Sequence, residues 1–463
     1  MEMSEIKTDI GCARAFVRLS LERKLLHKHL KTIFSNEHLL QKLYKRYAFL
    51  RSEEEREQFL FHILSLNAVD FSCFTHTFIA TKMQYEVMVV AGIDRFASAS
   101  IWIMITGSLG NTSVINLPVN SLQFTFDHKN LGVLSTLRIG HTLHQKSSNP
   151  TKWYLDYIIV RNNITAQTFR FNCGRWFGRG VDDGALERLL VAEVLPRESP
   201  KSDGTSSTTN PQQSTLSIFG GLISRPESPI SGIFTGGSLA SQKAQSVLHY
   251  STQSLARRRR SPSVTRNPDS DGNNPRISEL HHQLGVAVNA LMKHFLAEQN
   301  YGGAQLTPLL CGENGLVSVL ERVFSLGRKE GLYSLFQKQY PWDYVEAVFN
   351  WFANFFRHGE SNRISKEQRS LIIFAYQLVR KIKDNNAVGK EGKFHVFILL
   401  TLRDHILSSL LPLMVWTPLT TNMYHEDAFL RQSNHTSYLS KLIASLNEFN
   451  FTLEKSLTYG IDM

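Results

Sequence analysis

The chain changes the spacing of its apolar residues twice, and this limits it to a multidomain fold. Over residues 1–82 apolar side chains recur every three to four positions, which is the period of an amphipathic helix. From Tyr85 to residue 171 they alternate with other residues, which is the period of a strand. From Ile277 to the end the helical period returns. Such a chain needs helical regions and a β region, each with its own apolar core.

Three amphipathic helices are predicted in the N-terminal region. The first runs from Cys12 to Ile33, and the second begins after Asn36, whose side chain can cap it. The third covers residues 53–69.

Two of these helices carry basic side chains on a face of their own. Such a face is ordinarily the solvated side of a helix, but it can also bind an acidic protein surface or anionic lipid headgroups. We treat six basic residues as candidate partner contacts: Lys24, Lys28, Lys31, Lys42, Lys45 and Arg46. We expect three neighbouring aromatic residues to belong to the core instead: Tyr44, Tyr47 and Phe49.

The region 83–196 is predicted to be an all-β sandwich, because short alternating runs are separated there by Gly, Asn, Ser and Pro clusters. A short helix over 184–190, capped by Asp182 or Asp183, is expected near its end. Four aromatic residues are expected to pack the two sheets together: Trp153, Phe169, Phe171 and Trp176.

Two loops of this region are candidates for membrane contact, because Phe96 and Leu143 lie near their apexes. Neither loop carries the dense lysine cluster that anionic membranes attract. No metal is predicted, because Asp94 and Asp127 are isolated in sequence, whereas calcium-binding loops use clustered acidic residues.

Residues 197–275 are rich in Ser, Thr, Pro, Gly and Gln and lack periodicity, which predicts a disordered linker. Within it, the run Arg257–Arg260 leads directly into Ser261 and Ser263. We interpret the pair of serines as candidate phosphorylation sites, because a phosphate there would partly neutralise the adjacent charge. A nuclear-import signal and a nucleic-acid patch are the alternatives.

The two helical regions are predicted to be copies of one fold. Residues 44–71 match 424–451 without gaps at ten identical positions, where chance would give about two. Upstream, with a shift of one residue, the apolar positions of the first helix fall on those of the segment that begins at Phe397. The second copy is preceded by a long helical stretch that the first lacks, so we expect the first copy to be without its N-terminal half.

Several long stretches resemble the DENN domain-containing protein 5 family, which are described as Golgi Rab-interacting proteins. They include IGCARAFVRLSLERKLL, LQFTFDHKNLGVLSTLRIGH, TFRFNCGRWFGRGVDDGALERLL, GKEGKFHVFILLTLRDH and the terminal GIDM. The resemblance covers nearly the whole chain except the linker. It implies the C-terminal RUN-PLAT-RUN portion of that family, without the DENN domain and without the N-terminal half of the first RUN domain.

The fold class that follows is multidomain, with four successive parts. These are all-α RUN helices over 1–82, an all-β PLAT/LH2-type sandwich over 83–196, a disordered linker over 197–275, and a second all-α RUN domain over 276–463. The resemblance implies a non-catalytic adaptor that binds a Rab small GTPase in its GTP form during Golgi–endosomal vesicle traffic. The six basic residues are then the candidate GTPase contacts. Two alternatives stay open: a peripheral lipid-binding protein acting through PLAT, and a regulatory fragment of a DENN-type Rab exchange factor.

Composition and motifs are consistent with a binding protein. The net charge of +11 favours acidic partners, but the chain has neither RNP-like aromatics nor a basic recognition helix, so nucleic acid is not predicted. No GxSxG, HExxH, Walker A or kinase motif occurs, so neither an enzyme nor a cofactor is predicted. Dispersed cysteines and a polar N-terminus favour a cytoplasmic protein. The family resemblance implies that it is peripheral on Golgi or endosomal membranes. Charged residues interrupt the apolar stretch from Phe397 to Trp416, so we expect a buried helix there.

Overall fold

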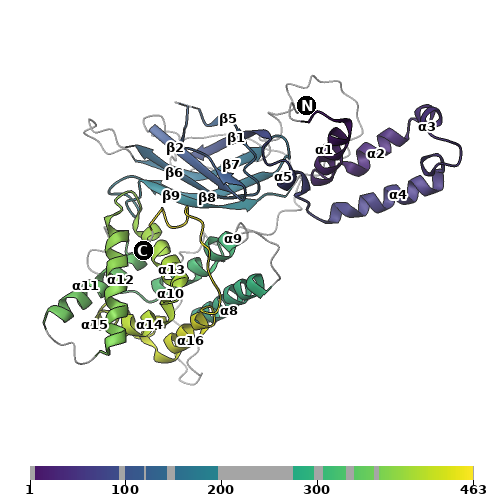
Figure 1. Cartoon of the computed structure of the whole chain (residues 1–463). Coiled ribbons are helices and arrows are strands. Elements are labelled where there is room, and N and C mark those ends of the chain that lie inside the picture. Colours follow the sequence, from purple (N-terminus) through teal and green to yellow (C-terminus); the bar gives the residue numbers. More distant parts are fainter. Residues whose placement is uncertain are drawn as a thin grey trace, which may run out of the picture. The chain divides into compact units, whose positions relative to one another are not determined.

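The computed structural model describes residues 6–92, 100–118, 121–142, 152–196, 275–296, 306–329, 338–358 and 364–461. An N-terminal helical part, a curved β-sheet and a C-terminal helical region follow one another in these residues (Figure 1). All three belong to one compact unit. The predicted linker with Ser261 and Ser263, and the loop residues Phe96 and Leu143, lie outside the described residues.

The N-terminal helical part departs from its prediction at one turn. The predicted helix over 12–33 is two helices, because Lys24 takes a left-handed conformation with a φ of 59°. Asn36 caps the following helix as predicted, with its side-chain oxygen accepting from the amide of Leu39 at 3.1 Å. The helices are α1 (Asp9–Glu22), α2 (Leu26–Phe34), α3 (Glu37–Leu43), α4 (Glu53–Ser65) and α5 (Cys73–Thr77), with single 3-10 turns at Phe49–Arg51 and Leu66–Ala68.

The β region is one continuous antiparallel sheet that curves into a half-barrel. Its strands are β1 (Lys82–Ala91), β2 (Ser100–Gly107), β3 (Gly110–Asn111), β4 (Ile115–Asn116), β5 (Gln123–Lys129), β6 (Leu134–Thr142), β7 (Trp153–Asn162), β8 (Thr168–Phe177) and β9 (Glu187–Val194). They are ordered β3-β2-β6-β9-β8-β7-β1-β5, with β4 paired to β2. Strand β9 links the two halves of the sheet, because its start pairs with β6 and its end pairs with β8.

The inner face of the sheet holds an apolar core. Trp153, Phe169 and Phe171 are buried in it as predicted, and Trp153 stacks on Phe177 with ring centroids 4.1 Å apart. Trp176 does not belong to this core, because 44% of it is exposed.

The helix predicted over 184–190 is absent. Residues 187–190 begin strand β9, and Asp183 caps a different helix, as described below.

The C-terminal helical region has a core of its own. The predicted apolar stripe of its first helix is confirmed, with Leu280, Leu284, Ala287 and Leu291 buried. The stretch predicted as one buried helix is two helices that meet at His405. The helices are α8 (Pro275–Leu296), α9 (Leu306–Cys311), α10 (Leu316–Ser325), α11 (Pro341–Arg357), α12 (Lys366–Asp384), α13 (Lys390–Arg403), α14 (Leu407–Trp416), α15 (Pro418–Met423) and α16 (Ser433–Ala444), with a 3-10 turn at Phe429–Arg431. None of the helices in the described ranges is both long and apolar enough to span a bilayer.

The predicted order of an all-α first RUN domain, a two-sheet sandwich and a second RUN domain is wrong. The chain is instead an N-terminal helical part, a half-barrel over residues 82–194 and a helical C-terminal region. An all-α domain needs an apolar core that its own helices enclose. Within the described residues, the N-terminal helices form no such core, because Ala15 of α1 and Phe74 of α5 join the core of the sheet and α4 buries no residue.

The C-terminal region is joined to the sheet by backbone hydrogen bonds. The amides of Leu186 and Glu187 both donate to the carbonyl of Ala387, at 2.9 and 3.1 Å, and Glu187 forms a parallel bridge with Val388. Asp183 then caps α13, because its side chain accepts from the amide of Glu391 at 3.2 Å. The segment before α13 therefore continues the hydrogen bonding of the sheet.

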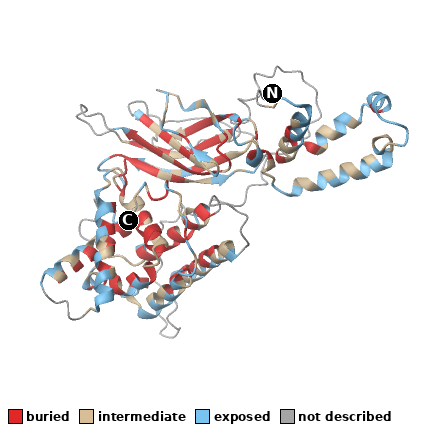
Figure 2. Ribbon diagram, in the orientation of Figure 1, coloured by how far each residue is buried: buried red, intermediate tan, exposed pale blue. Residues whose placement is uncertain are grey.

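The predicted internal repeat is visible in the backbone. The 3-10 turn at Phe49–Arg51 recurs 380 positions later at Phe429–Arg431. The left-handed residue Lys24, with a φ of 59°, recurs 381 positions later as His405, with a φ of 57°. The two copies differ in burial, since α2, α3 and α4 are mostly exposed or intermediate while the C-terminal helices are largely buried on their inner faces (Figure 2).

Candidate functional site

The six predicted basic contacts lie on α2, on α3 and in the turns beside them. Lys24 is half-buried and forms an ion pair with Asp70 at 2.8 Å. The ammonium group of Lys45 lies 6.0 Å from the centroid of the Tyr47 ring. Five of the six are exposed and able to meet an acidic partner: Lys28, Lys31, Lys42, Lys45 and Arg46.

The aromatic residues near these lysines are not core residues, so that prediction is wrong. Tyr44 and Phe49 are 41% and 45% exposed, and Tyr47 is 84% exposed. Phe49 makes an edge-on contact with Phe59 of α4, with ring centroids 5.7 Å apart. Exposed aromatic side chains flanked by cations are typical of protein interfaces.

A second candidate site is a cavity of about 880 Å³ where β8 and β9 face the helices α8, α9, α10 and α13. Its apolar side is lined by side chains such as Leu189 and Leu309, and its polar side by charged groups. Cavities of this size at the junction of two structural regions are common ligand sites.

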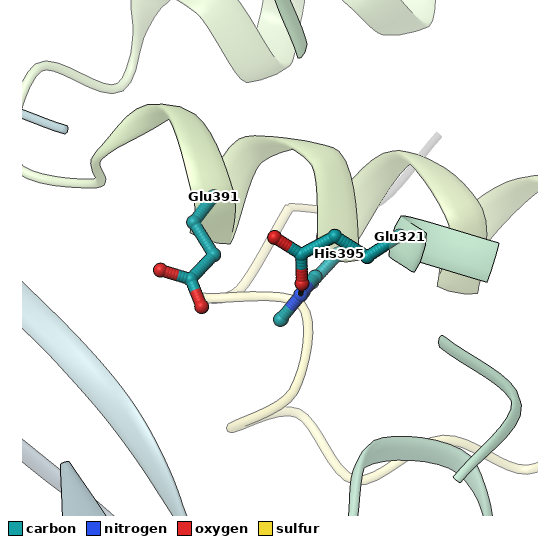
Figure 3. Close-up of side chains that lie close together, drawn as sticks. All are labelled: Glu321, Glu391 and His395. Carbon is teal, nitrogen blue, oxygen red and sulfur yellow. Dashed lines mark hydrogen bonds and ion pairs between the residues drawn. The ribbon is translucent and has the colours of Figure 1, made fainter. Parts of the chain in front are cut away.

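Three potential metal ligands meet on the polar side of this cavity (Figure 3). Glu321 comes from α10, and Glu391 and His395 come from successive turns of α13, with their ligand atoms within 4.8 Å of one another. The Nε2 atom of His395 lies 2.9 Å from a carboxylate oxygen of Glu321. Sequence analysis missed this group, because α10 and α13 are far apart in the chain and neither carries a metal-binding motif.

The two partners of this hydrogen bond shift each other's pKa. Burial lowers the pKa of His395, but the hydrogen bond to Glu321 and the charge of Glu321 outweigh it, so the pKa is raised. Burial raises the pKa of Glu321, but the hydrogen bond from His395 outweighs it, so the pKa is lowered. Both shifts favour the charged forms, so the contact is stabilised as an ion pair.

Arginine side chains from the sheet form ion pairs with the third member of this group, Glu391. Glu391 forms ion pairs with Arg175 and Arg188, and Arg188 also pairs with Asp183. Arg175 in turn pairs with Asp182, which accepts a hydrogen bond from Tyr340 at 2.5 Å. A cation bound at this position would have to displace two guanidinium groups, so the chemistry of the cluster fits a joint between sheet and helices better than a metal site.

The hydrogen bonds around Asp182 have an electrostatic consequence. Burial raises its pKa, but the hydrogen bonds from Arg175 and Tyr340 outweigh this, so the pKa is lowered. Asp182 therefore stays ionised and can hold Arg175 in place at neutral pH.

Comparison with known families identifies both kinds of region. The family model of the RUN domain matches residues 1–76 and 283–457, which together make up more than half of the chain. The model of the PLAT/LH2 domain matches residues 85–191, which is the half-barrel. The chain therefore belongs to the RUN domain family and also carries a PLAT/LH2 domain.

The similar proteins and structures cover only part of the chain. Human lipoxygenase homology domain-containing protein 1 is 28% identical over 104 residues, which is 21% of this chain and 5% of that protein. The mouse protein is 28% identical over 141 residues, which is 26% of this chain and 7% of that protein. The chain thus spans a small fraction of the length of these relatives.

The similar solved structures also cover only part of the chain. A coral 8R-lipoxygenase structure matches with 16% identity and a TM-score of 0.18, over 24% of this chain and 17% of that one. The alpha-toxin of Clostridium perfringens matches with 14% identity and a TM-score of 0.19, over 31% of this chain and 39% of that one.

Proposed function

We propose that this protein is a non-catalytic adaptor that binds a small GTPase of the Rab class in its GTP form. The adaptor acts on the cytoplasmic face of Golgi or endosomal membranes in vesicle traffic. We further infer kinship with the DENN domain-containing protein 5 family, from the long stretches quoted above. The observation that supports the proposal most is the RUN match on both helical parts, because RUN domains commonly interact with small GTPases.

The N-terminal surface has the chemistry that such a contact needs. Lys28, Lys31 and Lys42 are exposed and project from two consecutive helices. Exposed cations of this kind raise the association rate with an acidic partner and help to choose among partners. The aromatic residues beside them can supply the apolar part of the contact.

A second candidate function is binding to membrane lipid, which the PLAT match supports because PLAT domains commonly bind membranes or lipids. The two functions are compatible in one protein, with the sheet adding membrane contact to the GTPase contact. They differ in one respect, since lipid binding does not depend on the nucleotide carried by a GTPase.

The test is binding of the purified chain to a panel of Rab GTPases loaded with a GTP analogue or with GDP, alongside anionic liposomes. Preference for a GTP-loaded Rab supports the adaptor. Liposome capture without any nucleotide-dependent binding would place the lipid function first. Faster nucleotide release from a Rab when the chain is added to a separate DENN domain would instead favour a regulatory part of an exchange factor.

Charge reversal locates the contact. Lys42→Glu with Arg46→Glu should weaken binding of the GTP-loaded Rab by about tenfold, and the loss should shrink as salt is raised. Both side chains are exposed, so the fold should persist, as circular dichroism can check. The matched control is Lys366→Glu with Arg380→Glu, two exposed cations on α12. Equal affinity of both variants would remove the α3 surface from the contact.

A further inference from the structure

The cavity between the sheet and the C-terminal helices is acidic, although the chain as a whole is basic. Among the described residues, five carboxylates line it, against two guanidinium groups and one imidazole. The chain has a net charge of +11, so the sign of the cavity does not follow from composition. Electrostatics therefore favour a positively charged ligand here. The five carboxylates belong to Glu187, Glu193, Glu313, Glu321 and Glu391.

The two guanidinium groups of the lining are already held by carboxylates. Arg175 pairs with Asp182 and Glu391. Arg188 pairs with Asp183 and with the same Glu391. A phosphate or carboxylate ligand would have to displace these ion pairs, which are shielded from water. An anionic headgroup would therefore meet repulsion from the rest of the lining.

Two of the five carboxylates have no cation of their own. Glu187, Glu321 and Glu391 each pair with a basic side chain. Glu193, near the end of β9, accepts a hydrogen bond from the side-chain amide of Asn172 at 2.9 Å. Glu313 lies in the turn between α9 and α10. Within the described ranges neither of these two forms an ion pair, and both are exposed, so they can meet a cation from solution.

The apolar side of the cavity suits a hydrocarbon chain better than a peptide. Leu189 and Val191 come from β9, which is hydrogen-bonded to β6 and β8. Ala287 and Ala290 face them from the interior of helix α8, whose backbone groups bond within the helix. A peptide would bring amide groups that need partners, and burying them without partners is costly. A hydrocarbon chain brings no such groups.

We propose that the cavity binds a single-chain amphipathic amine. The ammonium group lies at Glu193 and Glu313, and the hydrocarbon chain lies between β9 and α8. A cavity of about 880 Å³ is of the size that holds small-molecule ligands. Val286, which is 54% exposed, lies where the cavity opens to water, so the charged head stays solvated while the chain is buried. This site requires neither a GTPase nor a membrane surface.

The test is isothermal titration calorimetry of the full chain with dodecylamine, dodecanol and dodecanoate, each below its critical micelle concentration. Saturable binding of one dodecylamine per chain is expected. Dodecanol has the same chain without the charge, so it should bind about threefold to tenfold more weakly, which is the contribution of two exposed ion pairs. Dodecanoate should bind most weakly, because the carboxylates of the lining repel it. Added salt should reduce the preference for the amine.

Two variants locate the site. Glu193→Gln with Glu313→Gln should weaken dodecylamine binding to the level of dodecanol and leave dodecanol binding unchanged. Both side chains are exposed, so the fold should persist. Val286→Trp should obstruct the opening and weaken the binding of both ligands.

A matched control is Glu426→Gln with Glu448→Gln, which removes two exposed carboxylates that do not line the cavity and should bind as the wild type does. Equal binding of dodecanoate and dodecylamine would overturn the proposal, as would a cavity variant that binds like this control. Unsaturable uptake of many amines per chain would show adsorption to acidic surfaces instead. A peptide of alternating lysine and leucine that binds here when dodecylamine does not would assign the cavity to a peptide.

Discussion

The N-terminal helical part and the C-terminal helical region share backbone turns over the repeated segment but differ in what covers them. Tyr44 and Tyr424 end their helices with almost identical dihedral angles, φ −123° and ψ 141° against φ −125° and ψ 146°. Tyr424 is nevertheless fully buried, and Tyr44 is 41% exposed. Helix ends and turns therefore form in both copies without the same cover, because capping and turn geometry are local.

This difference in cover separates the contribution of burial to stability from that of local backbone structure. In the C-terminal region an apolar residue at a repeat position contributes through burial, whereas in the N-terminal part the same residue keeps much of its contact with water. The two copies therefore allow burial to be varied while the local sequence and backbone stay nearly constant.

The largest expected difference comes from truncating one phenylalanine in each copy. Phe429→Ala should lower the free energy of unfolding by about 3 to 5 kcal/mol, because it removes a buried ring and leaves a cavity. Phe49→Ala should cost less than about 1 kcal/mol, because the ring is already partly solvated. Urea unfolding of both variants measures this, and equal losses would contradict the difference in cover.

A smaller difference in lost stability is expected when the N-terminal caps of α13 and α1 are removed. Helix α13 is capped by Asp183 from the loop between β8 and β9, whereas α1 is capped by its neighbour Thr8, whose hydroxyl accepts from the amide of Gly11 at 3.1 Å. Asp183→Ala should cost about 3 kcal/mol, because it also leaves the buried Arg188 short of a partner. Thr8→Ala should cost about 1 kcal/mol. Thermal unfolding compares them.

Asp183→Asn sharpens this second comparison, because it keeps a capping oxygen and removes the charge. Asp183→Asn should therefore lower the free energy of unfolding by less than Asp183→Ala does. If Asp183→Ala costs no more than Thr8→Ala, the contact between sheet and α13 contributes little to stability.

The smallest expected effect is a pH dependence of stability that arises from His395 in the C-terminal copy. His395 occupies the position that Arg14 holds in the N-terminal copy. Because its pKa is raised in the folded state, its stabilising contribution is present below the unfolded pKa and is lost as pH rises through the folded value. The lowered pKa of Glu321 has the opposite sign, so its contribution is lost only as pH falls through that lower value.

The ion pair therefore stabilises the fold between these two pKa values. His395→Gln should lower Tm at pH about 6, by the equivalent of about 1 kcal/mol or less, and the difference should shrink towards pH about 8. Calorimetry over this range measures it. A difference that is constant with pH would show that His395 contributes only by packing.

Local features of the fold could be predicted from the sequence. The stripe from Leu280 to Leu291 and the cap at Asn36 depend on neighbours within one turn, and both are confirmed. Strand β9 could not be predicted, because its short apolar run fits a helix as well as a strand. Its pairing with β6 and β8, for example Thr136 with Val191, decides the outcome.

The candidate sites show the same limit. The basic residues of α2 and α3 could be found from the sequence, since charge on one helix face is a local pattern. The exposure of Tyr44 and Phe49 could not, because it depends on which helices lie across from them. The cluster of Arg175, Glu391 and His395 joins strand β8 to helix α13, and no spacing in the sequence indicates that contact.

The bonds from Leu186 and Glu187 to Ala387 have a consequence for cleavage of the chain. Any cut within residues 198–272 divides the polypeptide between the sheet and the C-terminal helices. The two pieces would still share the carbonyl of Ala387, the cap at Asp183 and the ion pairs of Arg188. A nicked protein would therefore stay together as one particle, so that the continuity of the chain and the integrity of the fold are separate properties here.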